Sequence, residues 1–253
     1  MDLGLTDRTF VVAAASGGLG RATATQLVAE GAKVVLVARR EDVLAEAVAD
    51  LGPEHAVALS ADLADPTAAE TASRLAVDTF GRLDGALVSV GGPPAGSVAS
   101  TTDEQWLSAF QSVFLAALRV TRAVQEHSTS TELALAWVLS TSVKAPIPGL
   151  AASNGLRPGL AMLIKQLADE TGPDGTRVVG LLPGRIETQR VRHLDSLSAD
   201  PAAARARSEA STPLRRSGRP EEFGRVAAFV LSPAASYLTG CVIPVDGGSL
   251  RAL

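Results

Sequence analysis

Residues 9–38, TFVVAAASGGLGRATATQLVAEGAKVVLVA, decide the fold, because two apolar runs flank a segment with helical spacing. The run from Thr9 to Ala15 predicts a buried strand, the glycines after it predict a tight turn, and the next residues predict a helix. Gly31 is suited to end that helix, and the run from Lys33 to Ala38 predicts a second strand parallel to the first. This stretch therefore forms a βαβ unit.

The same alternation continues along the chain. Further strands are expected at residues 56–60, 86–90, 133–139, 177–182 and 241–245, and helices at 41–50, 66–80, 103–126, 153–170 and 220–232. Thr102 or Asp103 is a suitable N-cap for the long fourth helix. Because the strand segments are apolar on both faces, we predict a single α/β domain over residues 1–253, a Rossmann-type doubly wound parallel sheet covered by helices on both faces.

Residues 187–218 interrupt this rhythm. The segment is rich in Asp, Ser, Ala, Pro and Arg and shows no strand pattern. It fits a mobile substrate lid over the mouth of the sheet, and it equally fits a solvated helical excursion.

Composition excludes several classes of function. The net charge of −4 leaves no basic surplus for a nucleic-acid backbone. A single cysteine, Cys241, and three histidines argue against disulfides and against a metal site. The opening residues do not resemble a signal peptide, and no apolar run reaches the roughly 18 to 20 residues of a membrane span. We therefore expect a cytoplasmic protein that contacts neither nucleic acid nor membrane.

The glycine-rich turn after the first strand is a candidate nucleotide site. In an open parallel sheet, ligands lie beyond the carboxyl ends of the strands, with phosphates against a helix N-terminus. Gly18 and Gly20 would let the backbone approach a pyrophosphate closely. The spacing does not match G-x-G-x-x-G, so a plain turn that joins strand to helix is the alternative reading.

Residues 13–22, AAASGGLGRA, resemble the T-G-x-x-x-G-x-G loop of the short-chain dehydrogenase/reductase family, with Ala13 and Ala14 in place of the Thr and the first Gly. Further stretches follow in family order: Ala61-Asp62-Leu63, Val88-Ser89-Val90-Gly91, Leu182-Pro183-Gly184 with Ile186 and Thr188, and VDGG at 245–248. The resemblance covers nearly the whole chain. It is closest in character to divergent members similar to β-ketoacyl carrier-protein reductases.

The resemblance implies a set of cofactor-binding residues. They are Ser16, Gly17, Gly18, Leu19 and Gly20 at the pyrophosphate, Asp62 and Leu63 at the adenine, Ser89, Val90, Gly91 and Arg157 at ribose groups, and Pro183, Gly184, Ile186 and Thr188 at the nicotinamide amide. An ordinary loop cap is the competing interpretation of Asp62.

The end of the second strand bears on the type of cofactor. Arg39 and Arg40 follow Ala38, and no acidic residue precedes Glu41. A guanidinium can bind a 2′-phosphate in bidentate fashion, whereas a carboxylate would accept hydrogen bonds from an unmodified ribose. The pattern favours NADP(H) over NAD(H), with two solvated arginines as the alternative.

The family's catalytic residues are a Tyr that transfers the proton, a Lys beside it, a Ser that positions the substrate oxygen and an Asn that anchors a water. By position they fall at Ser153, Arg157, Ser140 and Val113, so only the Ser is retained. Ser153 is a much weaker acid than a Tyr, and an Arg with its ordinary pKa above about 12 cannot pass a proton. The chain's one Tyr, Tyr237, lies far along the sequence.

The proton must therefore come from another group. Lys144 is the nearest titratable residue in the sequence, and a bound water or a substrate hydroxyl would serve as well. Ser140 is interpreted as an oxyanion donor or as a cap of the strand end. Asn154 is expected to be the N-cap of the following helix, and His127 and His193 are assigned to the surface.

Three functions remain open. The first is an NADP(H)-dependent oxidoreductase, of the carbonyl reductase or alcohol dehydrogenase type, with an altered proton path and a small carbonyl or alcohol substrate. Loss of a general acid costs about 10²- to 10⁴-fold, less than the positioning of the reactants contributes. The alternatives are a nucleotide- or ligand-binding protein without turnover and non-redox chemistry on the same fold. The resemblance also implies a homo-oligomer, a tetramer or a dimer.

Overall fold

The computed structural model describes residues 2–251 and contains one parallel sheet of seven strands in the order β3-β2-β1-β4-β5-β6-β7. The strands are β1 (Thr9–Ala13), β2 (Lys33–Ala38), β3 (Ala56–Ser60), β4 (Gly85–Val88), β5 (Ala134–Val138), β6 (Arg177–Pro183) and β7 (Cys241–Val245). The strand order reverses between β1 and β4, where Val11 lies between Val35 and Ala86. The predicted doubly wound sheet is confirmed.

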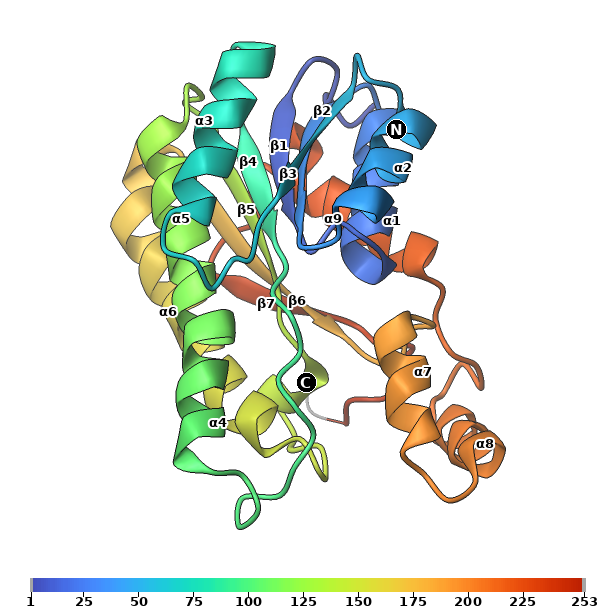
Figure 1. The fold of residues 1–253 in the computed structure, drawn as a ribbon. Coiled ribbons are helices and arrows are strands. Elements are labelled where there is room, and N and C mark those ends of the chain that lie inside the picture. Colours follow the sequence, from blue (N-terminus) through green and yellow to red (C-terminus); the bar gives the residue numbers. More distant parts are fainter. Residues whose placement is uncertain (1, 252–253) are drawn as a thin grey trace.

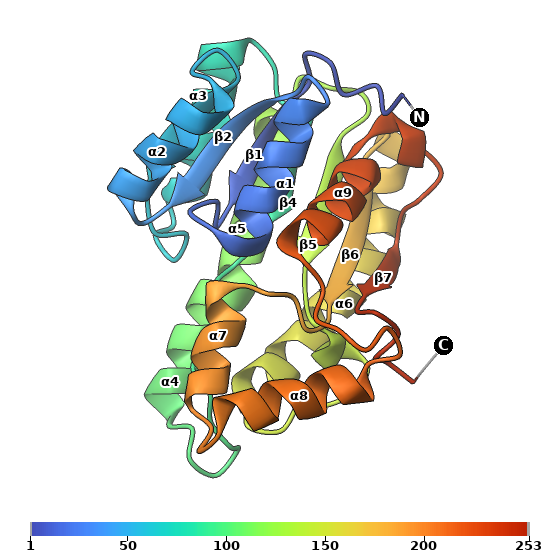
Figure 2. The ribbon, with the colours of Figure 1, turned by 90° about the vertical axis from the view of Figure 1, so that its right-hand side faces the viewer.

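Helices cover both faces of the sheet (Figures 1 and 2). One layer contains α1 (Gly18–Ala29), α2 (Glu41–Leu51) and α9 (Pro220–Leu231), and the other contains α3 (Ala68–Phe80), α4 (Asp103–Ala109), α5 (Ala116–His127) and α6 (Ala151–Thr171). Each layer encloses its own apolar core, and central strands such as β1 and β5 are buried at every residue. Burial on both faces explains their unbroken apolar sequences.

The long fourth helix is continuous but changes pitch within its length. Thr102 caps it through a reciprocal capping box with Gln105, so Thr102 is the N-cap of the two that were considered. A π-helical turn over Phe110–Leu115 then joins α4 to α5. By length and composition the whole helix, Asp103–His127, could cross a membrane, yet its buried residues pack on the sheet and on α3 as those of a core helix do.

The start of α6 differs from the prediction. The helix begins at Ala151 rather than at Ser153, with Leu150 as N-cap residue. Asn154 therefore lies inside the first turn and is not the cap. Its side chain instead accepts from the Ile147 amide and donates to the Ile147 carbonyl, at 3.0 and 2.9 Å. Asn154 thus ties the loop before the helix, which a local capping rule cannot anticipate.

Residues 187–218 form two helices, α7 (Gln189–Ser196) and α8 (Pro201–Ser211). Figures 1 and 2 show them projecting beyond the carboxyl end of the sheet, apart from the two main layers. Neither helix contains a fully buried residue. The segment is therefore a helical excursion, and it occupies the place expected of a lid.

Candidate functional site

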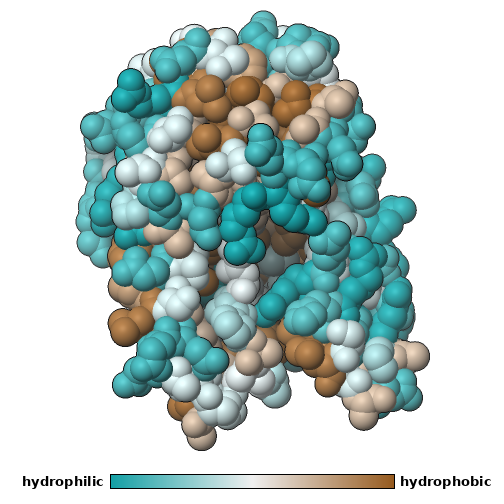
Figure 3. All heavy atoms as spheres, in the orientation of Figure 1, coloured by the Kyte–Doolittle hydropathy of each residue, from teal (hydrophilic) through white to brown (hydrophobic). Residues whose placement is uncertain are grey.

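A cavity of about 570 Å³ lies at the carboxyl ends of β1, β4, β5 and β6, and α7 forms one wall. In Figure 3 the surface is hollowed between the main body of the molecule and the α7–α8 segment. A smaller cavity of about 310 Å³ continues from it over the ends of β2 and β3, and the two share Ser16, Arg40 and Ser89. The site therefore spans the point where the strand order reverses, as expected for a dinucleotide.

The glycine loop presents a free helix N-terminus to the larger cavity. No side chain caps α1 at Gly17, so its first amide groups are left for a ligand. Gly18 has a φ of +54°, and a Cβ on Gly20 would lie 2.6 Å from the Ala14 carbonyl oxygen. These features fit the pyrophosphate of a dinucleotide. Ala14 itself adopts a left-handed φ of +52°, which a side chain disfavours.

The two arginines after β2 differ in their surroundings. The Arg40 guanidinium donates to the Ser16 carbonyl and hydroxyl oxygens, both at 3.3 Å, and so reaches back over the glycine loop. Arg39 is largely exposed and lies 4.0 Å from Asp62. Both arginines line the smaller cavity, where they could meet a 2′-phosphate.

The structure brings nearly all of the predicted site residues to these two cavities. The larger is lined by Ser16, Gly17, Gly18, Leu19, Gly20, Arg40, Ser89, Val90, Ser140, Ser153, Arg157, Pro183, Gly184, Ile186 and Thr188, and the smaller by Ser16, Arg39, Arg40, Asp62, Leu63, Ser89 and Gly91. Lys144 is exposed and lines neither. Its position gives no support to a role as the catalytic acid.

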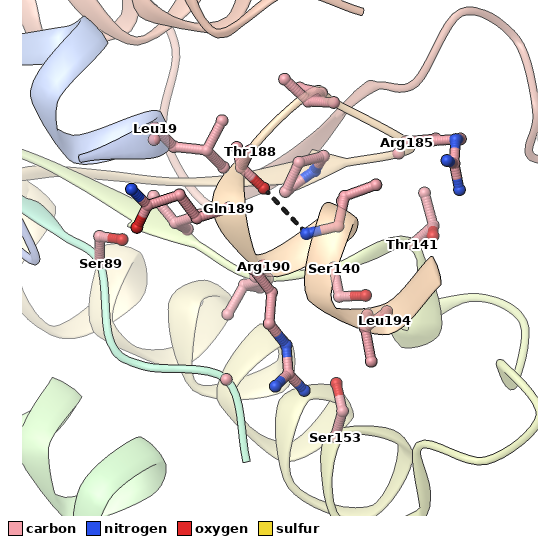
Figure 4. A pocket seen from close by; sticks show the side chains of 18 of the residues that line it. Leu19, Ser89, Ser140, Thr141, Ser153, Arg185, Thr188, Gln189, Arg190 and Leu194 are labelled. Carbon is pink, nitrogen blue, oxygen red and sulfur yellow. Dashed lines mark hydrogen bonds between the residues drawn. The ribbon is translucent and has the colours of Figure 1, made fainter. Parts of the chain in front are cut away.

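Ser140 and Ser153 line the chemical end of the larger cavity, and the buried Ser142, which does not line it, contacts Ser153. Ser140 follows β5, and its hydroxyl accepts from the Ser142 amide at 3.1 Å, which leaves the O–H free to donate. The Ser142 and Ser153 hydroxyls are 3.3 Å apart. Ser142 was missed in the sequence because nothing local marks it. In Figure 4, Ser140 and Ser153 both face the cavity.

Arg157 lies one helical turn after Ser153 on α6 and lines the same cavity. It is fully buried, and its Nη1 donates to the Val138 and Leu139 carbonyls at 2.8 and 3.0 Å, at the end of β5. Burial, and then the charge of Arg190, lower the pKa of Arg157 to about 10. The expectation of an ordinary pKa was therefore wrong, because the sequence did not show that the side chain leaves solvent. The guanidinium still carries a full charge at neutral pH.

Arg190 is the main feature of the cavity that sequence reasoning missed. It extends from α7 across the opening, where Nη2 donates to the Pro93 carbonyl at 2.7 Å. Figure 4 shows its guanidinium above Ser153, with Ser140 nearby. Burial lowers the pKa of Arg190. Arg192 follows it closely on the same helix, and only the packing of α7 shows that Arg190 lines the cavity whereas Arg192 does not.

The remaining candidates lie elsewhere. Val113 is completely buried in the π-helical turn and offers no polar side-chain atom there. Tyr237 is fully exposed and lines neither cavity, so it does not replace the family's Tyr. His193 is exposed as expected. His127, in contrast, is partly buried and lies 2.7 Å from Glu70 of α3, so its assignment to the open surface was wrong because the partner is distant in sequence.

Comparisons with known proteins agree with this arrangement. A family model described as enoyl-(acyl carrier protein) reductase matches residues 13–249. The chain is 31% identical to a levodione reductase from Leifsonia aquatica, over 98% of this chain and 96% of that protein. The chain belongs to the short-chain dehydrogenase/reductase family. It is by membership a short-chain oxidoreductase.

Two solved structures of this family are especially informative. L-Sorbose reductase from Gluconobacter frateurii, in complex with NADPH and L-sorbose, superposes with a TM-score of 0.93 over the whole of both chains at 27% identity. An NADPH-bound short-chain oxidoreductase from Pseudomonas aeruginosa, described as containing an atypical catalytic center, has a TM-score of 0.89 at 29% identity over 98% of both chains. An atypical catalytic center thus occurs in a similar protein that binds NADPH.

Proposed function

We propose that this protein is an NADP(H)-dependent oxidoreductase that interconverts a small carbonyl compound and its alcohol by an atypical proton path. The observation that carries the proposal is one continuous groove with two chemically distinct ends. Arg40 and the glycine loop form the nucleotide end, and Ser140 lies at the other end beside the apolar wall. NADPH-bound relatives with the same fold support the cofactor assignment.

The bound nicotinamide would supply or accept the hydride. For this chain, Ser140 donates its O–H to the substrate oxygen as negative charge develops there. Arg157 donates hydrogen bonds to the end of β5 and contributes a fixed positive charge to the lining of the same cavity. Thr188 caps α7 through the Val191 amide at 3.3 Å and so fixes the lid next to the nicotinamide pocket (Figure 4).

The proton reaches the product oxygen without a tyrosine. The hydroxyls of Ser142 and Ser153 are within hydrogen-bonding distance of each other, and Ser153 lines the cavity. A serine is too weak an acid to give up its proton outright, but a chain of hydroxyls can pass one from water to an alkoxide, whose basicity is similar. Ser153 is therefore assigned to relay the proton.

The second candidate is a binding protein that retains the nucleotide site without redox turnover. It is favoured by Val113 and Ser153, which replace two groups of the family's catalytic set. Non-redox chemistry is a third possibility, and it would form product without cofactor consumption.

Turnover separates these candidates. Oxidation of NADPH is followed with a panel of aldehydes and ketones, for the native protein and for Ser140→Ala. We expect measurable turnover that falls about 10²- to 10³-fold in the variant, the usual cost of losing an oxyanion donor. Tight NADPH binding without oxidation across the panel would instead establish the binding protein.

The cofactor preference is tested separately by fluorescence titration with NADPH and NADH. We expect tighter binding of NADPH, and Arg40→Ala should weaken NADPH binding about 10-fold while leaving NADH binding nearly unchanged. Equal affinities for the two nucleotides in the native protein would overturn the assignment of a 2′-phosphate site.

We further propose that the protein assembles as a homo-oligomer in the cytoplasm. Leu107, Phe110 and Met162 are exposed apolar residues on the adjoining α4, π-helical turn and α6. Such side chains suit a symmetric interface between copies of the chain. Light scattering on the purified protein gives the mass, and a monomer at micromolar concentration would contradict the proposal.

A further inference from the structure

The larger cavity is lined with positive charge only. Among the described residues that line it, the ionisable side chains are Arg40, Arg157, Arg185 and Arg190, with no Asp, Glu, Lys or His. The net charge of the whole chain is −4, so this local surplus does not reflect the composition of the protein. A one-sign lining in a partly enclosed space raises the local concentration of ligands of opposite charge.

Two of these arginines are accounted for. Arg185 forms a bidentate ion pair with Asp195 of α7, at 2.9 and 2.5 Å, which neutralises it. Arg40 lies at the nucleotide end against Ser16. The remaining pair lies at the chemical end: Arg190 is near Ser153 and Ser140 in Figure 4, and Arg157 follows Ser153 by one turn of α6.

Arg157 and Arg190 have no acidic partner within the part of the chain that the structure describes. Their hydrogen bonds go to main-chain carbonyls of β5 and to Pro93. After burial, the charge of Arg190 is the second cause that lowers the pKa of Arg157. Two like charges, partly or fully removed from water, destabilise the empty site unless an anion enters.

The geometry suits an anion held between α7 and the end of β5. Arg157 is held by hydrogen bonds to the end of β5, and Arg190 of α7 is held against the loop after β4. A Cβ on Gly92 would lie 3.1 Å from Arg190 Nε, so the guanidinium is closely packed there. A planar guanidinium matches the two oxygens of a carboxylate, while Ile147, Leu150 and Leu194 offer an apolar wall for the rest of the ligand.

We propose that the substrate is an oxo acid, whose carboxylate is bound by Arg190 with support from the charge of Arg157. That this oxo acid is a substrate rests on the proposed function, whereas the carboxylate site itself does not require turnover. Binding of the substrate carboxylate to Arg190 would also draw α7 against the main body of the molecule. It would place the substrate carbonyl beside Ser140.

Matched ligands test the carboxylate site without catalysis. Calorimetry on the NADP⁺-saturated protein compares hexanoate with hexanamide, which have the same chain length and differ in charge. We expect hexanoate to bind at least about 10-fold more tightly, the effect of a charge-assisted bidentate pair. Equal affinities for the acid and the amide would overturn the proposal.

A pair of variants on α7 locates the effect. Arg190→Met should remove the preference for hexanoate, whereas Arg192→Met, an exposed arginine on the same helix that does not line the cavity, should keep it. NADPH affinity should stay unchanged in both variants. If Arg190→Met instead weakens NADPH binding and keeps the preference for the acid, Arg190 serves the cofactor and the proposal fails.

Turnover is then measured with 2-oxohexanoate and 2-oxohexanamide. If the reductase function holds, kcat/KM is at least about 10-fold higher for the acid, and Arg190→Met removes this difference. A preference for hexanoate in binding, with no NADPH oxidation by either oxo compound, would support the carboxylate site and overturn the reductase. The failures of the two proposals are thereby distinguishable.

Discussion

Ala14 shows how a single residue departs from its family at a measurable cost. It stands where the resemblance expects the first glycine of the loop, and its φ of +52° lies in the left-handed region. A Cβ in that region costs about 1 to 2 kcal/mol relative to the right-handed one. Packing of the loop against Gly20 imposes the conformation, since the Ala14 carbonyl lies where a side chain on Gly20 would be.

Ala14→Gly should therefore stabilise the protein. The expected gain in the free energy of unfolding is about 0.5 to 1 kcal/mol, because the relief of strain is partly offset by the greater freedom of glycine in the unfolded chain. Urea denaturation of the native protein and the variant measures it. Ala15→Gly, at a neighbouring position without a positive φ, is the control and should destabilise.

At the scale of elements, α9 depends on an ionic network at its N-terminus. Glu222 accepts from both terminal nitrogens of Arg216, at 2.8 and 2.6 Å, and from the amide of Arg219 at 2.8 Å. These contacts with Arg216 and Arg219 lower the pKa of Glu222 to about 2. The network joins the segment after α8 to the helix that packs on α1.

The contribution of Glu222 should depend on pH. Its folded-state pKa lies below the unfolded value of about 4.3, so the stabilisation is complete above about pH 5 and is lost as pH falls towards 2. Glu222→Gln keeps a capping group but removes the charge, and should cost about 0.5 to 1 kcal/mol at pH 7. Thermal denaturation at several pH values measures the difference in stability between the native protein and the variant. A difference that persists unchanged at pH 2 would contradict the ionic explanation.

Close packing of α1 on α9 should make Gly224 intolerant of a side chain. A Cβ there would lie 2.6 Å from the Ala22 carbonyl oxygen, so the helices must move apart. Gly224→Ala is expected to destabilise by about 1 to 3 kcal/mol in urea denaturation. Gly172→Ala is the matched control, because a Cβ at that position meets nothing within 4 Å and should change stability little.

At the scale of the whole molecule, the main body and the α7–α8 segment differ in how they are held. The body has two apolar cores, whereas α7 and α8 contain no fully buried residue. The segment is fastened mainly by polar contacts, such as Arg185 with Asp195 and Arg190 with Pro93. Segments with little apolar burial open at low free energy.

The α7–α8 segment should therefore exchange its amide hydrogens faster than the sheet does. NADPH and a carboxylate ligand together should slow exchange over residues 189–211 at least about 10-fold, because binding on the wall of the cavity opposes opening. Hydrogen exchange followed by mass spectrometry measures this, with β5 as the internal reference. Equal protection with and without ligands would show that the segment does not act as a lid.

The fold, and the residues of the proposed nucleotide end, could be predicted from the sequence alone. The periodicities that mark strands and helices are local in the sequence. The glycine loop, Arg40 and Ser140 each follow a strand, and the carboxyl ends of parallel strands lie at the same edge of the sheet. The start of α6 was not predicted correctly, because Asn154 contacts Ile147 in the loop before the helix rather than capping the helix.

Only the tertiary structure decided the chemical environment of the cavity. Burial of Arg157, the Ser142–Ser153 contact and the inward direction of Arg190 arise where β5, α6 and α7 meet, from residues up to about fifty positions apart. The sequence contains many arginines but does not show which of them lack a carboxylate, because pairing such as that of Arg185 with Asp195 is set by packing. The surplus of positive charge in the cavity is therefore a property of the folded chain.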